Sequence, residues 1–245
     1  MPRPRALRPL APLLGGAALL AACPAAALAG PSVDLNSAGS RVFAMEGTGS
    51  SIGQTAPAGD VNGDGHADLI TGSQLRLESG AAMVVFGGPD APPRVALGAI
   101  PAGAGFRIVG DVFPDMVGRS VAGAGDVNGD GLDDVIVGAP CTSPHGSCSG
   151  TAAVVYGSRT PVDVRISALT PAQGFRVYGG APEDQVGIAV DGAGDVDGDG
   201  FDDVIVGAQD DAPGRVDAGG AYLVRGGPSR ADVDLQDLDR RVAFR

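Results

Sequence analysis

The sequence predicts an all-β fold that is built from three repeated units of about four antiparallel strands each. One acidic segment recurs three times, beginning at Asp60, Asp126 and Asp195, so the copies stand 66 and 69 residues apart. Each copy runs directly into a short apolar stretch rich in β-branched residues, which favour strands. The 245 residues include 41 glycines and no tryptophan, and only 4% are aromatic. This composition favours short strands joined by turns over a helical fold.

The repeat extends well beyond the acidic segment. An Ile-Gly or Val-Gly pair precedes each copy, and a Gly-Ser or Gly-Ala pair ends the apolar stretch that follows it. Further strands are expected at 81–87, 151–157 and 220–226, and outer strands at 105–110, 174–179 and 241–245, with a leading copy of the outer strand at 41–47. A single four-stranded unit cannot bury both of its faces, so neighbouring units are expected to stack.

This periodicity divides the chain into five segments. We expect a leader at 1–29, a leading segment with an outer strand at 30–48, and three units at 49–110, 111–179 and 180–245.

The first segment has the three-part layout of a secretory signal peptide. Met1 to Pro9 carries three Arg, Leu10 to Ala22 is apolar and uncharged, and Ala27 to Ala29 forms a small-residue cleavage site. The apolar run is too short to span a bilayer as a helix. Export to the cell exterior or the cell surface is therefore predicted.

A bacterial lipobox at Leu20 to Cys23 is the competing processing site, and it would place a lipid anchor on Cys23. Pro24 follows this cysteine directly and no polar tether comes after it, so we favour cleavage after Ala29.

Net charge excludes one class of partner. The chain carries −12 at pH 7, and all of its 17 basic residues are Arg. Nucleic-acid binding requires basic patches, so no nucleic-acid partner is expected, whereas cation binding suits this charge.

Two cysteines remain once a leader containing Cys23 is removed. Cys141 and Cys148 flank a turn-rich stretch, and in an oxidising compartment they are predicted to form a disulfide. Two free thiols, or a metal site that includes His145, are the alternatives; a fourth ligand for such a site is missing at a recognisable spacing. His145 is otherwise expected to be a solvated loop residue.

The acidic segments have the pattern of calcium-binding loops. Oxygen-bearing side chains occupy positions one, three, five and nine of nine residues, and position six is Gly, which allows a positive φ. Position seven would contribute its backbone carbonyl. The predicted ligands are Asp60, Asn62, Asp64, His66 and Asp68 in the first loop, Asp126, Asn128, Asp130, Leu132 and Asp134 in the second, and Asp195, Asp197, Asp199, Phe201 and Asp203 in the third.

Carboxylate and carbonyl oxygens favour Ca²⁺ over zinc or copper, and a pliable loop does not impose the strict octahedron of Mg²⁺. About three calcium ions, one per unit, are therefore expected. Ordinary hairpin turns are the alternative, but three loops with so many carboxylates would repel themselves without a cation. An EF-hand is disfavoured because position twelve is Thr71, Val137 or Val206 rather than Glu.

The loops differ in charge. The third has four Asp ligands where the first two each have one Asn, so it is expected to hold calcium more tightly. Asp133 and Asp202 occupy position eight, and we expect their side chains to point outward and to raise the local negative charge.

Val117-Gly118, the loop 126–134 and Gly138-Ala139-Pro140 together resemble an FG-GAP repeat. This is the unit of the N-terminal β-propeller of integrin α-chains and of many bacterial exported proteins. The resemblance covers about residues 41–245 and implies β-propeller blades of the seven-bladed type, with calcium in hairpin loops on one face. The first unit has Gly72-Ser73 in place of Gly-Ala-Pro, and the third has Gln209 in place of Pro. Three units are too few to close a ring, so an incomplete propeller is expected.

These observations favour an exported, non-catalytic binding or adhesion module, with an extracellular protein or glycan as its unidentified ligand. The chain has only two histidines, His66 and His145, and it contains no H-E-x-x-H, no G-x-S-x-G and no phosphate-binding loop. The alternative is that the repeats accompany, or are a truncated piece of, a secreted hydrolase of the phospholipase or polysaccharide-degrading type. A cell-surface spacer is a third possibility.

Overall fold

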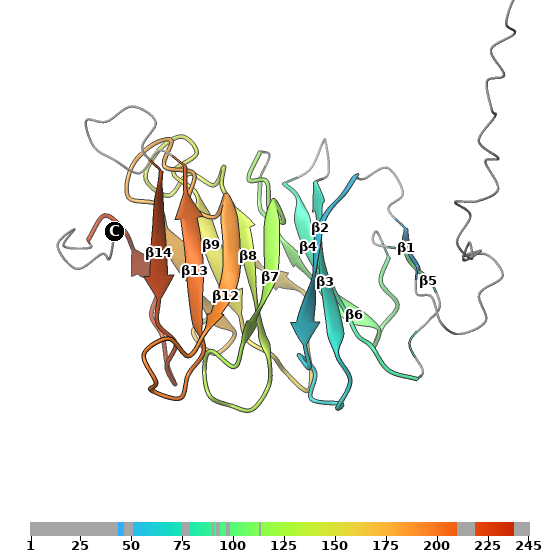
Figure 1. Cartoon of the computed structure of the whole chain (residues 1–245). Helices are drawn as coiled ribbons and strands as arrows, with labels where there is room; N and C mark the ends of the chain where they lie inside the picture. Colours follow the sequence, from blue (N-terminus) through green and yellow to red (C-terminus); the bar gives the residue numbers. More distant parts are fainter. Residues whose placement is uncertain are drawn as a thin grey trace, which may run out of the picture. The chain divides into compact units, whose positions relative to one another are not determined.

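The computed structural model (Figure 1) describes residues 44–46, 51–74, 79–89, 91, 94–96, 99–112, 114–209 and 219–237, all of which lie in one compact unit, Ser40–Arg245. The all-β prediction is confirmed: the regular structure of these residues is β-strand, apart from the short 3₁₀ turn η2 (Ile166–Ala168). The predicted signal peptide, Cys23 and the outer strand at 241–245 lie outside the described residues.

Each of the first two repeats forms an antiparallel four-stranded meander, as predicted. The strands of the first are β2 (Ser51–Gly59), β3 (Asp68–Gln74), β4 (Ala81–Val85) and β6 (Gly105–Val109). Those of the second are β7 (Ser120–Gly125), β8 (Asp134–Ala139), β9 (Thr151–Val155) and β11 (Gly174–Tyr178). The third repeat has β12 (Ala189–Gly194), β13 (Asp203–Ala208) and β14 (Gly220–Val224) in the described residues.

A short fifth strand, which the sequence did not predict, extends the first two sheets. β10 (Val164–Arg165) pairs parallel to β6, and β15 (Val233–Asp234) pairs parallel to β11. The same arrangement recurs at the start of the fold, where β5 (Arg94–Ala96) pairs parallel to β1 (Ala44–Glu46). The leading copy of the outer strand is therefore paired in the same way as the outer strands of the two units that follow.

An arginine–aspartate contact holds each fifth strand in place. The backbone N–H and guanidinium of Arg107 both donate to Asp163, the residue before β10. Arg176 repeats this with Asp232, the residue before β15, with its N–H 2.8 Å from Oδ1 and its guanidinium 2.7 Å from Oδ2. Two-pronged guanidinium–carboxylate pairs fix direction as well as distance, so these contacts set where the chain returns to the sheet.

The hydrophobic core lies between neighbouring sheets. All five residues of β4 and all five of β9 are buried, because each sheet is covered on both faces. One cluster of apolar side chains combines residues of the first and second units, and a second cluster combines residues of the second and third. Valine and alanine predominate in both clusters, as is typical of strands without a solvent-facing side.

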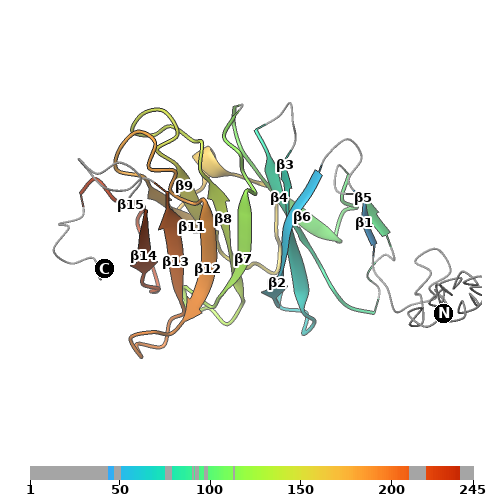
Figure 2. The same ribbon diagram turned by 45° about the horizontal axis from the view of Figure 1, so that its top comes forward.

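Glycines allow the innermost strands of neighbouring units to approach closely. β2 lies against β7, and β7 lies against β12 (Figure 2). A Cβ atom on Gly72 would stand 2.0 Å from the carbonyl oxygen of Gly118, and one on Gly138 would stand 1.9 Å from that of Gly187. The Val-Gly and Gly-Ala motifs of the repeat are therefore the places where one unit contacts the next backbone to backbone.

The outer face of the third unit is more open than the corresponding faces of the first two. Val127, Ile136 and Val154 of the second unit are all 0% exposed, whereas their counterparts Val196, Ile205 and Leu223 are 57%, 40% and 42% exposed. The described strands form separate sheets, and no strand pairing among them closes a ring.

Candidate metal centre in three acidic loops

The three acidic loops occupy equivalent places in the fold. Each connects the first strand of its unit to the second: β2 to β3, β7 to β8, and β12 to β13. Figure 1 shows these connections at the same end of the sheets, at the bottom of the view. The repeat therefore sets three similar groups of oxygen atoms side by side.

The position-one aspartate organises each loop. In the second loop, Asp126 Oδ1 accepts the backbone N–H of Asp130 at 3.0 Å, and Oδ2 accepts that of Gly131 at 2.9 Å. Gly131 has a φ of 84°, a conformation that glycine adopts without strain. The first and third loops repeat these bonds from Asp60 and Asp195. The predicted role of the position-six glycine is thus visible in the backbone.

Positions three and five complete an exposed cluster of oxygens. Asn128 Oδ1 accepts the N–H of Asp130 at 2.9 Å, and its Nδ2 donates to Asp130 Oδ2 at 2.9 Å. In the third loop, where position three is an aspartate, carboxylate oxygens of Asp195, Asp197 and Asp199 lie within 4.8 Å of one another. Exposed hard oxygen donors at this spacing fit a calcium ion.

The position-nine aspartates lie at the base of the loops instead. Asp134 is fully buried, and its two oxygens accept N–H bonds from Val127 at 2.9 Å and from Gly157 at 2.8 Å. Asp68 and Asp203 are held in the same way. The structure therefore groups positions one, three and five and ties position nine to the sheet, where each of its oxygens retains a lone pair.

Burial also changes the acidity of these groups. Removal from water, with a smaller contribution from the charges of Asp130 and Asp126, raises the pKa of Asp134 to about 8 against two opposing backbone hydrogen bonds. Burial likewise raises the pKa of Asp68. At the exposed rim, the side-chain hydrogen bond from Asn62 lowers the pKa of Asp64. A bound cation would favour the ionised form of all three carboxyls.

Position seven makes the same backbone hydrogen bond in all three loops. The N–H groups of His66, Leu132 and Phe201 each donate to the position-five aspartate of their own loop, at 2.9, 2.9 and 3.1 Å. The His66 side chain is exposed and lies beside a cavity of about 550 Å³ that Asn62 and Asp64 also line.

Comparison with known proteins places two of the loops in a known repeat. A family model described as "FG-GAP repeat" matches residues 53–82 and 117–154, which contain the first two loops. The chain contains FG-GAP repeats. It is 30% identical over 170 residues to mouse integrin alpha-IIb, 31% over 169 residues to Caenorhabditis briggsae integrin alpha pat-2, and 29% over 168 residues to Xenopus laevis integrin alpha-4. These matches cover 64–65% of this chain but only 13–15% of the integrins, so the chain spans a small part of their length.

The position-eight aspartates of the second and third FG-GAP units were expected to point outward, and this prediction is wrong. Asp133 is half-buried, and its Oδ2 accepts the N–H of Asp60 in the first unit at 2.7 Å. Asp202 accepts the N–H of Asp126 in the second unit at 2.9 Å. Sequence reasoning missed this contact because it follows the packing of units rather than the spacing within one loop.

A basic residue at the third FG-GAP loop was also missed. Arg225 Nη1 lies 3.1 Å from Asp197 Oδ2, which is the extra carboxylate of that loop. The guanidinium offsets part of the charge on which the expected tighter calcium binding depends. The relative affinity of the third loop therefore stays a prediction.

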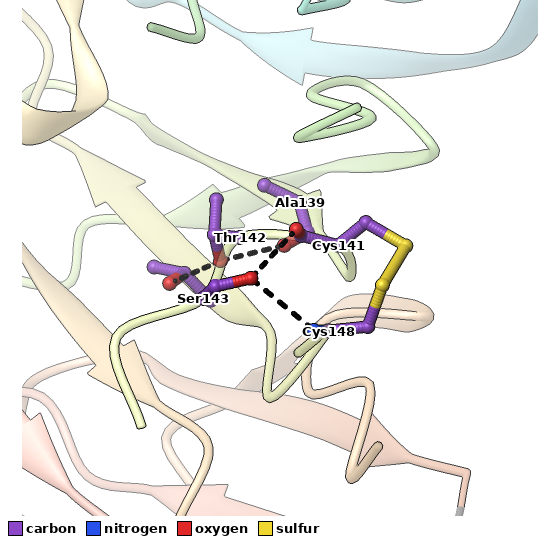
Figure 3. The surroundings of a disulfide bond; sticks show 6 residues. Ala139, Cys141, Thr142, Ser143 and Cys148 are labelled. Carbon is purple, nitrogen blue, oxygen red and sulfur yellow. Dashed lines mark hydrogen bonds between the residues drawn. A yellow bond between two sulfur atoms is a disulfide. The ribbon is translucent and has the colours of Figure 1, made fainter. Parts of the chain in front are cut away.

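The cysteines of the second FG-GAP unit are joined by a disulfide between Cys141 and Cys148, as predicted (Figure 3). Free thiols and a cysteine metal site are thereby excluded in this structure. His145, in the same loop, is not simply solvated, since its Nε2 lies 2.7 Å from Asp234 Oδ2. This contact joins the disulfide loop to β15.

Proposed function

We propose that this protein is an exported, calcium-stabilised FG-GAP module that binds an extracellular protein or glycan and carries out no catalysis of its own. The observation that carries the proposal is the repeated loop geometry, in which side-chain oxygens from positions one, three and five converge at the same place in three units. Export is inferred from the leader at residues 1–29.

The donor set fits a hard divalent cation. In each loop the side chains at positions one, three and five would hold the ion, with the position-seven carbonyl and the position-nine carboxylate as further ligands. The ion would supply two positive charges against the mutual repulsion of the carboxylates. The N–H bonds to Asp126 and its counterparts already hold these oxygens in place, so little reordering is required.

A binding role is supported by the similarity to integrin alpha chains and by the sites available for recognition. The Cys141–Cys148 disulfide braces most of the stretch 142–149 in the second unit, and surface loops held by a scaffold often carry binding residues. No helix in the described part of the chain is long and apolar enough to cross a membrane.

Thermal unfolding of the purified protein, with calcium in one sample and a chelator in the other, tests the calcium-dependent part. At a calcium concentration 100 times the dissociation constant, each occupied site adds about 2.7 kcal/mol to the free energy of unfolding. For a chain of this size, each kcal/mol raises the midpoint by about 2–4 °C, so a large rise is expected.

The control is a variant with Asp64, Asp130 and Asp199 all changed to Ala, which removes one exposed ligand from each loop. Its midpoint in chelator should stay near that of the unaltered protein, and calcium should no longer raise it. An unaltered protein whose midpoint is the same with calcium and with chelator would reduce the loops to plain turns and refute the proposal.

A further inference from the structure

Neighbouring acidic loops contact each other through a reciprocal pair of hydrogen bonds. Asp202 Oδ2 accepts the N–H of Asp126 at 2.9 Å, and the N–H of Asp202 donates to the carbonyl of Asp126 at 3.1 Å. Asp133 makes the same two bonds with Asp60, at 2.7 and 3.3 Å. In both pairs, position eight of one unit holds position one of the unit before it.

We propose that Asp133 and Asp202 are positioning residues for the cation site of the preceding unit. Neither carboxylate takes part in that site, because each reaches the backbone of a ligand residue rather than the ion. The inference rests on the proposed calcium function of the loops. It adds that a later unit supports the site of the earlier one. The first and second loops each depend on the unit that follows in the sequence.

The glycine before each loop supports this assignment. A Cβ atom on Gly59 would stand 2.2 Å from Asp133 Oδ2, and one on Gly125 would stand 2.0 Å from Asp202 Oδ2. Both glycines also have positive φ, of 78° and 72°. The position-eight carboxylate thus occupies the space that the side chain of any residue other than glycine would fill at position 59 or 125. It lies close enough to accept a hydrogen bond from the backbone N–H of the next residue, Asp60 or Asp126.

A second contact acts on the same loop from the same side. The Leu132 side chain covers Gly63, where a Cβ atom would stand 2.7 Å from Leu132 Cδ2. The Phe201 ring covers Gly129 in the second loop, where a Cβ atom would stand 2.5 Å from Phe201 Cε1. Position seven of one unit therefore restrains position four of the unit before it, and position eight restrains position one.

Position one is the residue at which such restraint has most effect. The two oxygens of Asp126 accept the N–H groups of Asp130 and Gly131, so the direction of this side chain sets the shape of the whole loop. Fixing the Asp126 backbone from outside reduces the number of arrangements the empty loop can adopt. Less ordering is then left for the ion to impose, which raises its affinity.

The third loop provides a contrast within the molecule. Within the described part of the chain, nothing lies within 4 Å of a Cβ atom on Gly194 or on Gly198 at position four, whereas Asp202 and Phe201 occupy the equivalent places beside Gly125 and Gly129 of the second loop. Among the described residues, none bonds the N–H of Asp195 from a following unit. The first unit has Ala67 at position eight, which cannot accept a hydrogen bond through its side chain.

The test is a calcium titration of the ¹⁵N-labelled full chain, followed by the NMR signals of the position-six amides. Gly65, Gly131 and Gly200 each donate to the position-one carboxylate of their own loop, so each reports on one loop. In Asp202→Ala, the calcium concentration at half-titration is expected to rise about tenfold for Gly131, as for other residues that orient metal ligands. The calcium concentration at half-titration should change much less for Gly200, although Asp202 belongs to the same loop as Gly200.

Two further variants separate positioning from a general loss of structure. Asp202→Asn keeps an oxygen acceptor and should restore most of the Gly131 affinity. Asp133→Ala should weaken calcium binding in the first loop, as reported by Gly65, and leave the half-titration concentration reported by Gly200 unchanged. Asp197→Asn gives the third loop the same side-chain ligands as the second, and Gly131 should then titrate at lower calcium than Gly200.

A readout without calcium completes the design. In chelator, the Asp126 amide should exchange with solvent faster in Asp202→Ala than in the unaltered chain. If no glycine amide of the unaltered chain responds to calcium, the calcium function fails and the positioning role fails with it. If the amides respond but Asp202→Ala leaves Gly131 titrating at its original concentration, the positioning role alone is refuted.

Discussion

At the scale of single residues, the buried and the exposed carboxylates of each loop have different environments. The exposed oxygens of positions one, three and five face one another and water, whereas Asp134 and its counterparts sit against the sheet and accept two backbone N–H bonds. The first group is accessible from solvent, and the second ties the loop to the strands. One repeat of nine residues therefore combines a ligand cluster with its own anchor.

The acidity of Asp134 makes stability depend on pH when calcium is absent. Its folded pKa of about 8 lies above the ordinary value of 3.8, so the folded state binds this proton more tightly. In chelator, the contribution of this group to the free energy of unfolding should be full below about pH 4 and should be lost as pH rises through about 8. Urea unfolding between pH 5.5 and 8 measures the slope.

Calcium should flatten that slope because it holds the carboxylate ionised. Asp134→Asn, which cannot ionise, should flatten it in chelator as well, whatever its effect on absolute stability. An unaltered protein whose slope in chelator is no steeper than that of Asp134→Asn would contradict the assignment.

The loop residues were predictable because their partners are near in sequence. Oxygen side chains at odd positions with Gly at position six indicate a compact acidic loop without knowledge of the fold, and the loop hydrogen bonds of positions one, three and five agree with it. Asp133 and Asp202 were placed wrongly because their partners lie 73 and 76 residues away. Their spacing within one loop contains no sign of that contact.

At the scale of elements, glycine sets the distance between adjacent units. Gly138 in β8 faces the backbone of Gly187, and neither residue has room for a side chain between them. This explains why the Val-Gly and Gly-Ala pairs recur together along the sequence. They mark the two sides of one contact.

Replacing one of these glycines should separate the units. In Gly138→Ala, the added Cβ would lie 1.9 Å from the Gly187 carbonyl oxygen, which neither backbone can easily avoid. We expect a loss of about 3 kcal/mol in the free energy of unfolding, the upper range for overpacking.

Gly207→Ala is the matched control, because the same position in the third unit has its nearest neighbours at 3.4 Å. It should change stability by no more than about 0.5 kcal/mol, the usual range for sites without close contacts. Urea denaturation of both variants decides the matter. Equal losses would show that β13 is covered as tightly as β8.

The apolar, β-branched runs correctly placed the strands that follow the acidic loops and those at 81–87, 105–110, 151–157, 174–179 and 220–226. The strands before the loops, β2, β7 and β12, are rich in small residues, and the sequence marked them only by a nearby Ile-Gly or Val-Gly pair. The fifth strands were missed because β10 and β15 are each two residues long and pair parallel to a strand far away in sequence. Such pieces have too few residues for an alternating pattern to appear. They depend instead on the Arg107–Asp163 and Arg176–Asp232 contacts.

At the scale of the whole molecule, stability arises between units rather than within them. Both apolar clusters join residues of two adjacent sheets, so each unit completes the core of its neighbour. The stacking of units was predictable because one sheet cannot cover itself. On the outer face of the third unit, which is covered less than the faces between units, the apolar side chains of Val196, Ile205 and Leu223 are exposed to solvent.

Substitutions on equivalent faces should therefore have unequal effects. Ile136→Thr places a hydroxyl in a fully buried site and should lower the free energy of unfolding by about 2–3 kcal/mol. Ile205→Thr together with Leu223→Thr, at sites 40% and 42% exposed, should change it by less than about 1 kcal/mol.

The same double variant should remain soluble at higher protein concentration, because exposed apolar patches promote association. Thermal unfolding and light scattering of the two variants measure the effects. A double variant as destabilised as Ile136→Thr would mean that this face is buried in solution.

The direction of the contacts between loops has a consequence for biosynthesis. A polypeptide leaves the ribosome from its N-terminus, so Asp60 emerges 73 residues before Asp133 and Asp126 emerges 76 residues before Asp202. The proposed ligands of the first and second sites are therefore synthesised well before the aspartate that is proposed to steady them. Maturation of the sites should proceed stepwise and one unit behind chain growth, each loop becoming rigid only when its successor has folded against it.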